Sequence, residues 1–299
     1  MDATTVIIDY EFASGGVREH SEELSAKDFM LSGGPGIYTA MRTVCGGRRV
    51  FLFDYHLQRI VDSHRAVLPD SAQQNDKTHW SELLRPLLRR GLDRVSHGES
   101  KITVLVGAEG VRLQFAPLQT SRAAESCWVR FVSGRREHPE AKSLEWVHER
   151  EALEKLIVSP VDDVVLVENA SDAEAPTFYE GTSSNFFAVR RVADDRCPEY
   201  RNFELLAAPQ GSVLLGTVMR LVLRICDRDG IHVVHGAGAG LAAWDGAFIS
   251  STSRLILPVE RVLYGSDGER WWPLDGANAL VAHLRESVLS LAAEQSTKM

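Results

Sequence analysis

One stretch decides how this chain folds and what chemistry it carries: Glu180-Gly181-Thr182-Ser183-Ser184-Asn185-Phe186-Phe187. It places a carboxylate at the end of an apolar run, Thr177 to Tyr179, and ahead of a second apolar run, Phe186 to Val189. The small residues between the two runs predict a strand, a tight turn and a second strand. A glutamate in this position faces the protein interior, where a carboxylate needs a partner.

A protonated pyridine nitrogen is one partner that suits a buried carboxylate. The stretch 180–187 resembles the signature of the class IV, fold-type IV pyridoxal-phosphate enzymes. That family includes branched-chain and D-amino-acid aminotransferases and aminodeoxychorismate lyase. The resemblance implies that Glu180 contacts the pyridine nitrogen of the cofactor. It also implies that the chain carries a Schiff-base lysine, a phosphate-binding arginine and small-residue donors to the phosphate.

Lys142 is the predicted Schiff-base lysine among the six lysines of the chain. It follows the apolar run 128–132 after a short loop, and it resembles the lysine segment of the family. A desolvated lysine forms a Schiff base readily, because burial lowers its pKa and exposes the nitrogen lone pair. The spacing from Lys142 to Glu180 is longer than the family leads us to expect, so the loop 168–176 is interpreted as an inserted turn. The other reading of Lys142 is a solvated lysine at the start of a helix.

Three segments supply the predicted phosphate site. The segment 54–60 begins a helix with Asp54 as the expected N-cap, and it resembles the family segment whose arginine, here Arg59, holds the phosphate. Arginine suits a phosphate because its planar fork can donate two hydrogen bonds. A helix that opens near Gly216 offers its first amides to an anion. The third segment, 248–253, resembles the family's turn that donates to the phosphate or to the substrate carboxylate. From these three segments, the predicted cofactor-binding residues besides Lys142 and Glu180 are Arg59, Thr217, Val218, Ser251 and Thr252.

The predicted substrate residues are Tyr38, Trp146, Ser253 and Arg254. Tyr38 and Trp146 each have an alternative reading as core residues. Arg254 follows the predicted phosphate turn, where it is expected either to touch an acidic substrate or to form a salt bridge. The charged segment 135–140 ahead of Lys142 departs from the family pattern and is expected to affect substrate selection.

The composition excludes several classes of protein. A net charge of −8 and a pI of about 5.7 argue against nucleic-acid binding, which calls for a basic surface. The four cysteines form no Cys-x-x-Cys pair, and the ten histidines are scattered, so no metal site is expected. The chain has no apolar stretch of about 20 residues, so no membrane segment is expected and the predicted location is cytoplasmic.

The pattern predicts an α+β or α/β protein with two domains, a small one at 1–120 and a large cofactor-binding one at 127–299, joined by a linker at 121–126. The fold implied by the resemblance is fold-type IV, with a mixed, barrel-like sheet in the large domain. Alternation and apolar spacing predict the individual elements. Strands are expected at 37–44, 49–53, 101–106, 111–115, 127–133, 163–168, 177–190, 203–208, 231–235 and 247–259, and helices at 54–68, 78–96, 143–157, 216–228 and 276–293.

The resemblance implies a pyridoxal-phosphate-dependent aminotransferase that moves an amino group between an amino acid and a 2-oxo acid, as branched-chain aminotransferases do. Lys142 and Glu180 are its expected catalytic residues. The resemblance also implies a homodimer in which the small domain of one subunit closes over the site of the other. Two alternatives stay open: a β-elimination lyase of the aminodeoxychorismate type, and a catalytically silent homologue that binds pyridoxal phosphate.

Overall fold

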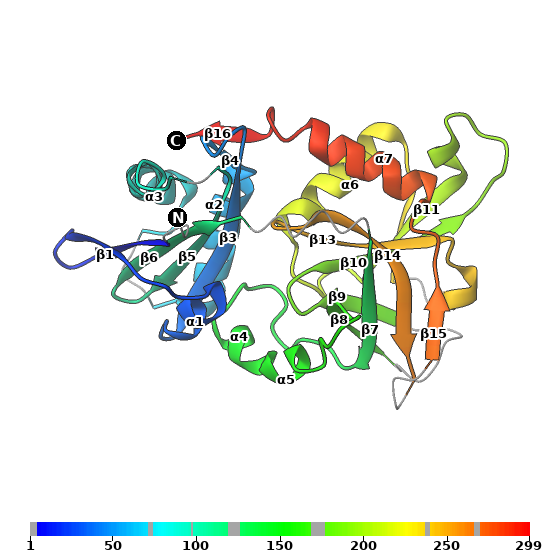
Figure 1. The fold of residues 1–299 in the computed structure, drawn as a ribbon, viewed down its shortest axis with the longest axis horizontal. Coiled ribbons are helices and arrows are strands. Elements are labelled where there is room, and N and C mark those ends of the chain that lie inside the picture. The colour runs from blue at the N-terminus through cyan, green and yellow to red at the C-terminus, as the bar shows by residue number, and fades with distance from the viewer. Residues whose placement is uncertain are drawn as a thin grey trace. The chain divides into compact units, whose positions relative to one another are not determined.

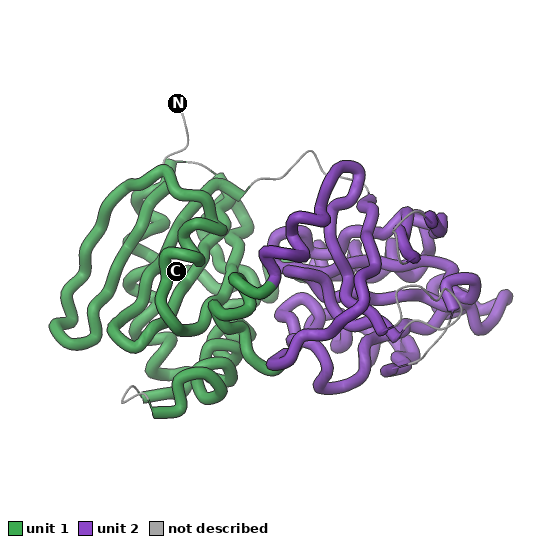
Figure 2. Tube along the Cα trace, turned by 90° about the horizontal axis from the view of Figure 1, so that it is seen from below, with its two compact units in different colours: residues 1–120, 140–149, 291–299 green, residues 121–139, 150–290 purple. Residues whose placement is uncertain are grey.

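The computed structural model describes residues 5–70, 74–96, 98–118, 126–168, 177–236, 240–265 and 270–299. The chain divides into two compact units (Figure 2). Unit 1 comprises residues 1–120, 140–149 and 291–299, and unit 2 comprises residues 121–139 and 150–290. Apart from their terminal residues Ser126 and Glu168, the predicted linker at 121–126 and the predicted inserted turn at 168–176 lie outside the described residues. The predicted domain boundaries stay a prediction.

Unit 1 is built on an antiparallel sheet of seven strands in the order β16-β4-β3-β5-β6-β1-β2 (Figure 1). Its strands are β1 (Val6–Glu11), β2 (Val17–Ser21), β3 (Gly36–Val44), β4 (Arg49–Phe51), β5 (Ser100–Gly107), β6 (Gly110–Pro117) and β16 (Ser296–Lys298). Its helices are α1 (Ala26–Leu31), α2 (Phe53–Val67), α3 (Lys77–Leu92) and α4 (Glu145–Glu149).

Alternating residues of this sheet feed two separate cores, as the two-residue period of a strand requires. Even-numbered residues of β5 such as Val104 pack with α2 and α3, whose apolar residues include Leu57 and Trp80. The odd-numbered Leu105 packs instead with Phe29 of α1, with Leu144 just before α4 and with Val147 in α4. Both faces of the sheet are therefore covered by helices.

Both predicted hairpins of unit 1 form, as β3–β4 and β5–β6. Gly47 shows why the first turn contains glycine. Its φ is +85°, and a Cβ there would lie 2.3 Å from the Gly98 carbonyl oxygen. The hairpin of β1 and β2 and the strand β16 were not predicted, because their short segments show little alternation of apolar and polar residues.

Two local predictions are wrong. Asp54 does not cap α2: the N-cap is Leu52, in the left-handed region at φ 53°, and no side chain bonds the first amides. Asp54 lies in the first turn and forms an ion pair with Lys77. The predicted helix 143–157 is broken into α4 and α5 (Glu151–Glu154), and the buried Arg150 between them donates to the Thr182 carbonyl.

Unit 2 contains a closed, mixed barrel of six strands in the order β10-β13-β14-β7-β8-β9, with β9 pairing back to β10 (Figure 1). The neighbours β7 and β8, and β7 and β14, run parallel, and the other barrel pairs are antiparallel. The barrel strands are β7 (Cys127–Ser133), β8 (Asp163–Glu168), β9 (Thr177–Gly181), β10 (Asn185–Arg191), β13 (Gly246–Ser251) and β14 (Leu255–Tyr264). This barrel is the mixed, barrel-like sheet that the resemblance predicts.

Further elements extend the barrel and pack on it: β11 (Phe203–Ala207), β12 (Val233–His235), β15 (Arg270–Pro273), α6 (Thr217–Asp229), α7 (Ala279–Ser290), and the 3-10 helices η1 (Glu199–Asn202) and η2 (Leu241–Ala243). The core is rich in aromatic side chains, with Phe131, Phe178 and Phe186 in edge-to-face contact and Trp244 packed against them. Gly230 ends α6 in the left-handed conformation, as is typical of a glycine at a helix C-terminus. Across the described ranges, no helix has both the length and the apolar character needed to span a membrane.

Candidate active site

The signature stretch forms the predicted strand, turn and strand. Glu180 lies one residue before the end of β9 and pairs with Asn185, the first residue of β10. The Gly181 amide donates to the Ser184 carbonyl across 2.8 Å and closes the turn. A Cβ at Gly181 would lie 2.3 Å from the Ser184 Oγ, so only glycine fits where the turn doubles back.

The carboxylate of Glu180 is buried and held from two sides. Its residue is only 4% exposed, and its Oε2 accepts a hydrogen bond of 3.1 Å from the Leu214 amide. Its Oε1 lies 3.9 Å from Nη1 of Arg136, whose side chain is also buried. The positive charge of Arg136 stabilises a carboxylate that burial alone would disfavour.

Arg136 belongs to the charged segment 135–140, which was expected to affect substrate selection. Nothing in the sequence indicates that it lies beside Glu180, because the two residues are far apart along the chain. An arginine in a run of charges is expected to be solvated until the fold is known. The structure therefore adds Arg136 to the candidate site within unit 2.

Asp163 is a second site residue that the sequence analysis missed. It opens β8 and is fully buried, at 0% exposure. Its Oδ1 accepts from the Thr182 hydroxyl at 2.8 Å and from the Thr182 amide at 3.3 Å, and its Oδ2 accepts from the Ser184 hydroxyl at 2.8 Å. The turn that follows Glu180 is thus anchored on one buried carboxylate.

The predicted phosphate residues of unit 2 meet at the start of α6. Gly216 is the N-cap of this helix and has no side chain to bond the first amides, so those of Thr217 and Val218 point to where an anion would sit. The Thr217 Oγ1 lies 3.2 Å from the Thr252 Oγ1, which comes from the turn between β13 and β14. Helix dipole, amides and two hydroxyls together suit a phosphate.

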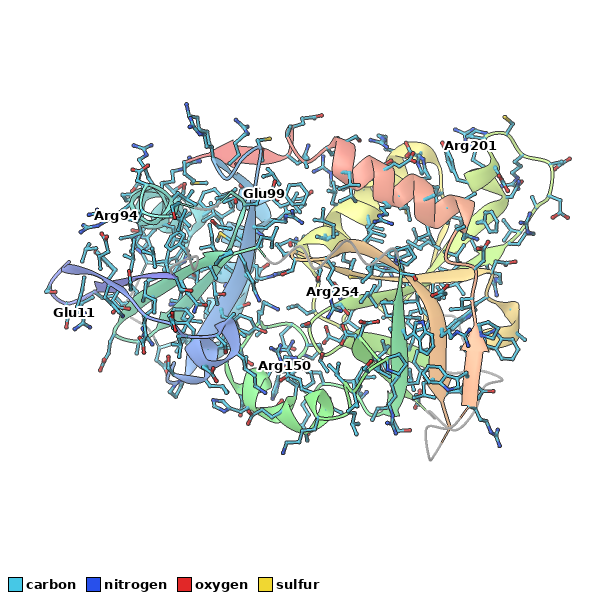
Figure 3. The ribbon with its side chains drawn as sticks, viewed as in Figure 1. Glu11, Arg94, Glu99, Arg150, Arg201 and Arg254 are labelled. Atoms are coloured by element: carbon cyan, nitrogen blue, oxygen red, sulfur yellow. The ribbon has the colours of Figure 1, made fainter. Side chains whose placement is uncertain are left out.

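The turn between β13 and β14 also holds the predicted residues Ser251, Ser253 and Arg254. Ser251 accepts a hydrogen bond of 3.2 Å from the Arg254 amide, and Ser253 is exposed. The Arg254 side chain, labelled in Figure 3, donates to the Asp163 Oδ2 at 2.9 Å and to the Asp162 carbonyl at 3.1 Å. Of the two readings of Arg254, the structure shows the salt bridge, and its partner is a buried carboxylate.

Lys142 lies in unit 1, in an extended segment and not in a helix. Its amide donates to the Ser63 Oγ at 2.9 Å, and its carbonyl accepts from the Tyr38 amide at 2.9 Å. The side chain is half-buried, and its Nζ lies 4.5 Å from the centre of the Tyr38 ring. The structure thus brings together two predicted residues, the Schiff-base lysine and the tyrosine of β3. Trp146 follows in α4 and is buried.

Arg59 is buried in α2, at 6% exposure, one turn after His56. His56 is completely buried, and its Nδ1 lies 2.7 Å from the Thr39 Oγ1. Burial lowers the pKa of His56 well below its ordinary value of 6.5, and the positive charges of Arg59 and Lys142 lower it further. His56 is therefore neutral, and it leaves the positive charge in this part of unit 1 to Arg59 and Lys142.

The residues present fit pyridoxal phosphate. A half-buried lysine amine suits the aldehyde, and the Glu180 carboxylate, fixed by the Leu214 amide, suits a protonated ring nitrogen. The uncapped start of α6 with the Thr217–Thr252 hydroxyl pair suits the phosphate. These donors and acceptors match the three polar ends of the cofactor in chemical type.

Comparison with known proteins supports this assignment. A model of the amino-transferase class IV family matches residues 36–262. Three solved structures share the fold: a hypothetical aminotransferase from Mycobacterium tuberculosis in a PLP-bound form, the T.th. branched-chain amino acid aminotransferase complexed with N-(5'-phosphopyridoxyl)-L-glutamate, and the branched-chain amino acid aminotransferase from Escherichia coli.

The identity is 17% to the first structure and 16% to the other two, with TM-scores of 0.68, 0.69 and 0.67. The alignments cover 95%, 99% and 98% of this chain, and 98%, 96% and 96% of the three structures. Among curated proteins, none matches this sequence. The family model spans most of the chain and the fold agrees with it along nearly the whole length, so this chain belongs to the class IV aminotransferases, the family of pyridoxal-phosphate-dependent enzymes that the signature stretch predicts.

Proposed function

We propose that this aminotransferase moves an amino group between an amino acid and a 2-oxo acid, with Lys142 and Glu180 as its catalytic residues. The observation that carries the proposal is the Glu180 carboxylate, buried at 4% exposure and fixed by the Leu214 amide. A carboxylate is kept ionised inside a protein only where it has a charged or hydrogen-bonded partner. A protonated ring nitrogen would complete that environment.

When bound, pyridoxal phosphate supplies an electron sink for the carbanion that forms at the substrate Cα. Glu180 holds the proton on the pyridine nitrogen, which keeps that sink effective. Lys142 would hold the cofactor covalently through Nζ. When that amine is free, it would take the proton from the substrate Cα and deliver it to the cofactor, which is the proton shift that amino transfer requires. The Tyr38 ring, whose centre lies 4.5 Å from Nζ, helps to orient the amine.

The phosphate is held by Arg59, Thr217, Val218, Ser251 and Thr252. Arg59 contributes a positive charge and a planar pair of donors. The first amides of α6 and the Thr217 and Thr252 hydroxyls contribute hydrogen bonds, and the helix dipole adds to them. Each contact acts on an end of the cofactor that does not react, so together they fix its orientation and leave its chemistry unchanged.

The substrates are proposed to be an amino acid, branched-chain or related, and a 2-oxo acid, with Tyr38, Trp146 and Ser253 beside them. The complex of the T.th. enzyme with a phosphopyridoxyl derivative of L-glutamate supports glutamate as one amino donor. Arg254 is an unsuitable ligand for an acidic substrate, because its guanidinium already bonds Asp163 and the Asp162 carbonyl.

We also propose a cytoplasmic homodimer. All four cysteines are free thiols, which suits a reducing compartment. The mass of the protein in solution, measured by light scattering after gel filtration, checks the dimer.

Reduction with borohydride tests the site directly. The purified protein is incubated with pyridoxal phosphate, reduced and digested, and the tagged peptide is sequenced. The tag is expected on Lys142, and a tag on any of the other five lysines would exclude this assignment. Unreduced protein is then supplied with single amino acids and 2-oxoglutarate. Formation of glutamate identifies an aminotransferase, release of pyruvate from an aminodeoxychorismate-type substrate identifies the lyase, and neither product identifies a silent homologue.

A further inference from the structure

Asp163 is a buried carboxylate for which the proposed function gives no role. It is fully buried and lies in unit 2 at the start of β8. A buried carboxylate is costly unless several donors satisfy it, and breaking such a group apart is strongly destabilising. Asp163 has several donors, and they come from two different turns of unit 2.

The first donors come from the turn that follows Glu180. The hydroxyls of Thr182 and Ser184 each lie 2.8 Å from a different oxygen of Asp163, and the Thr182 amide adds a longer bond of 3.3 Å. A Cβ at Gly181 would lie 3.1 Å from the Asp163 Oδ2, so the backbone of the turn packs closely against the carboxylate. This anchoring fixes the residues just beyond Glu180.

The second donor comes from a different turn. Arg254 donates across 2.9 Å to the Asp163 Oδ2, the same oxygen that accepts from Ser184. The Arg254 amide bonds the Ser251 Oγ at 3.2 Å, and the Thr252 Oγ1 between them meets the Thr217 Oγ1 at 3.2 Å. One carboxylate therefore joins the turn beside Glu180 to the turn that carries Thr252.

We propose that Asp163 is a positioning residue that holds Glu180 and Thr252 in one fixed arrangement by bonding the Thr182–Ser184 turn and Arg254 at the same time. The inference rests on the proposed function, in which Glu180 serves the ring nitrogen and Thr252 the phosphate. Two contacts to one rigid ligand gain affinity when their spacing is set before binding. Loss of Asp163 therefore weakens cofactor binding although Asp163 does not touch the cofactor.

The experiment compares Asp163→Asn with Glu204→Gln in the full-length protein. Glu204 is a suitable control, because it is also a buried carboxylate of unit 2, paired with Arg190 and His232 and remote from both turns. The dissociation constant of pyridoxal phosphate for the apoprotein is measured by fluorescence titration. Asp163→Asn is expected to raise it about 10-fold or more and to lower kcat at saturating cofactor, whereas Glu204→Gln should leave both unchanged.

Hydrogen exchange of the apoprotein gives a readout that does not need the cofactor. Peptides covering 180–185 and 250–254 should exchange faster in Asp163→Asn and not in Glu204→Gln. If Asp163→Asn does not fold, Thr182→Val tests the inference instead, because it removes only the hydroxyl that donates to the Asp163 Oδ1. A rise of roughly 3-fold or more in the dissociation constant supports the inference, and an unchanged constant overturns it.

The two proposals fail in different ways. A wild-type protein that does not bind pyridoxal phosphate would overturn the proposed function and this inference together. A wild-type protein that binds it through Lys142, next to an Asp163→Asn variant with the same dissociation constant and exchange, overturns this inference alone. An equal loss of affinity in Glu204→Gln would also overturn it, because the effect would then be one of general stability.

Discussion

At the scale of single residues, the proposed chemistry depends on charged side chains that the fold itself buries and orients. The Glu180 carboxylate accepts a hydrogen bond from the Leu214 amide and lies near Arg136. Arg59 in α2 is also buried. A charge that is already desolvated and aligned need not reorganise during the reaction, so it acts more strongly than the same charge in water. Both residues can be tested by single substitutions.

Glu180→Gln keeps the shape of the side chain and an oxygen that can still accept from the Leu214 amide. It removes the charge that holds the proton on the pyridine nitrogen. We expect cofactor binding to persist and kcat to fall by about 10²-fold or more, which corresponds to about 2.7 kcal/mol of transition-state stabilisation. Steady-state kinetics at saturating cofactor measure this, and an unchanged kcat would remove Glu180 from the mechanism.

Arg59→Ala should act on affinity and not on chemistry. Loss of a charge-assisted pair with the phosphate costs about 1.5–3 kcal/mol, so the dissociation constant of the cofactor should rise roughly 10- to 150-fold. Arg65→Ala is the matched control, because Arg65 lies exposed near the end of the same helix. If the two variants bind the cofactor equally well, Arg59 has no part in the phosphate site.

At the scale of elements, the two ends of α6 differ in how their backbone groups are capped. Its start is left without a side-chain cap, whereas its end is closed by Gly230 at φ +68°. Gly230→Ala forces a side chain into the left-handed region and should destabilise the fold by about 1–2 kcal/mol. Thermal unfolding should show a lower Tm for this variant.

Gly34→Ala is the control for that substitution. Gly34 has no positive φ, and a Cβ built on it meets nothing within 4 Å. Its Tm should stay near that of the wild type. A Tm for Gly230→Ala equal to that of Gly34→Ala would show that the cap contributes nothing.

Elements with a strong local pattern could be predicted from the sequence, and those that depend on distant partners could not. The hairpins β3–β4 and β5–β6 alternate clearly and carry turn glycines, and α6 has a strong apolar spacing and a C-cap. The helix expected at 143–157 is interrupted at Arg150, whose side chain bonds the carbonyl of Thr182, a residue 32 positions away. Strand β16 exists because β4 is beside it, which its own sequence cannot show.

The same distinction applies to the candidate site. Lys142, Glu180 and Arg59 stand in short segments that resemble a family, so the sequence alone predicts them as site residues. Asp163 and Arg136 have no such segment. Their place in the site follows from side chains brought to them by other strands and loops, so only the fold reveals them.

At the scale of the whole molecule, acid sensitivity can be traced to a paired carboxylate between α6 and α7. Arg228 and His283 each donate to Asp229 across 2.7 Å. Mainly because of the bond from Arg228, the pKa of Asp229 falls from 3.8 to about 2. A carboxylate whose pKa is lower in the folded state adds stability above its unfolded pKa and loses it as the pH falls through the folded pKa.

Asp229→Asn should therefore lower the Tm at neutral pH. The difference from the wild type should shrink as the pH falls from about 4, be mostly lost at about pH 2, where the wild-type carboxyl is half protonated, and vanish at still lower pH. Asp227→Asn, an exposed neighbour on the same helix, should leave the Tm unchanged. Calorimetry across this pH range measures both, and a difference at pH 2 as large as the one at neutral pH would contradict the role given to Asp229.

The closure of the barrel has a consequence for engineering this protein. Strands β9 and β10 are joined by a single residue pair, Glu180 with Asn185, and without that pair the ring of strands would be open. Glu180, which is proposed to act in catalysis, thus also closes the barrel. Libraries that randomise 180–185 should yield mostly insoluble clones, whereas libraries at exposed positions such as Ser253 should keep their yield. Directed evolution of new substrate preference should begin at such exposed positions and leave the Glu180–Asn185 pair unchanged.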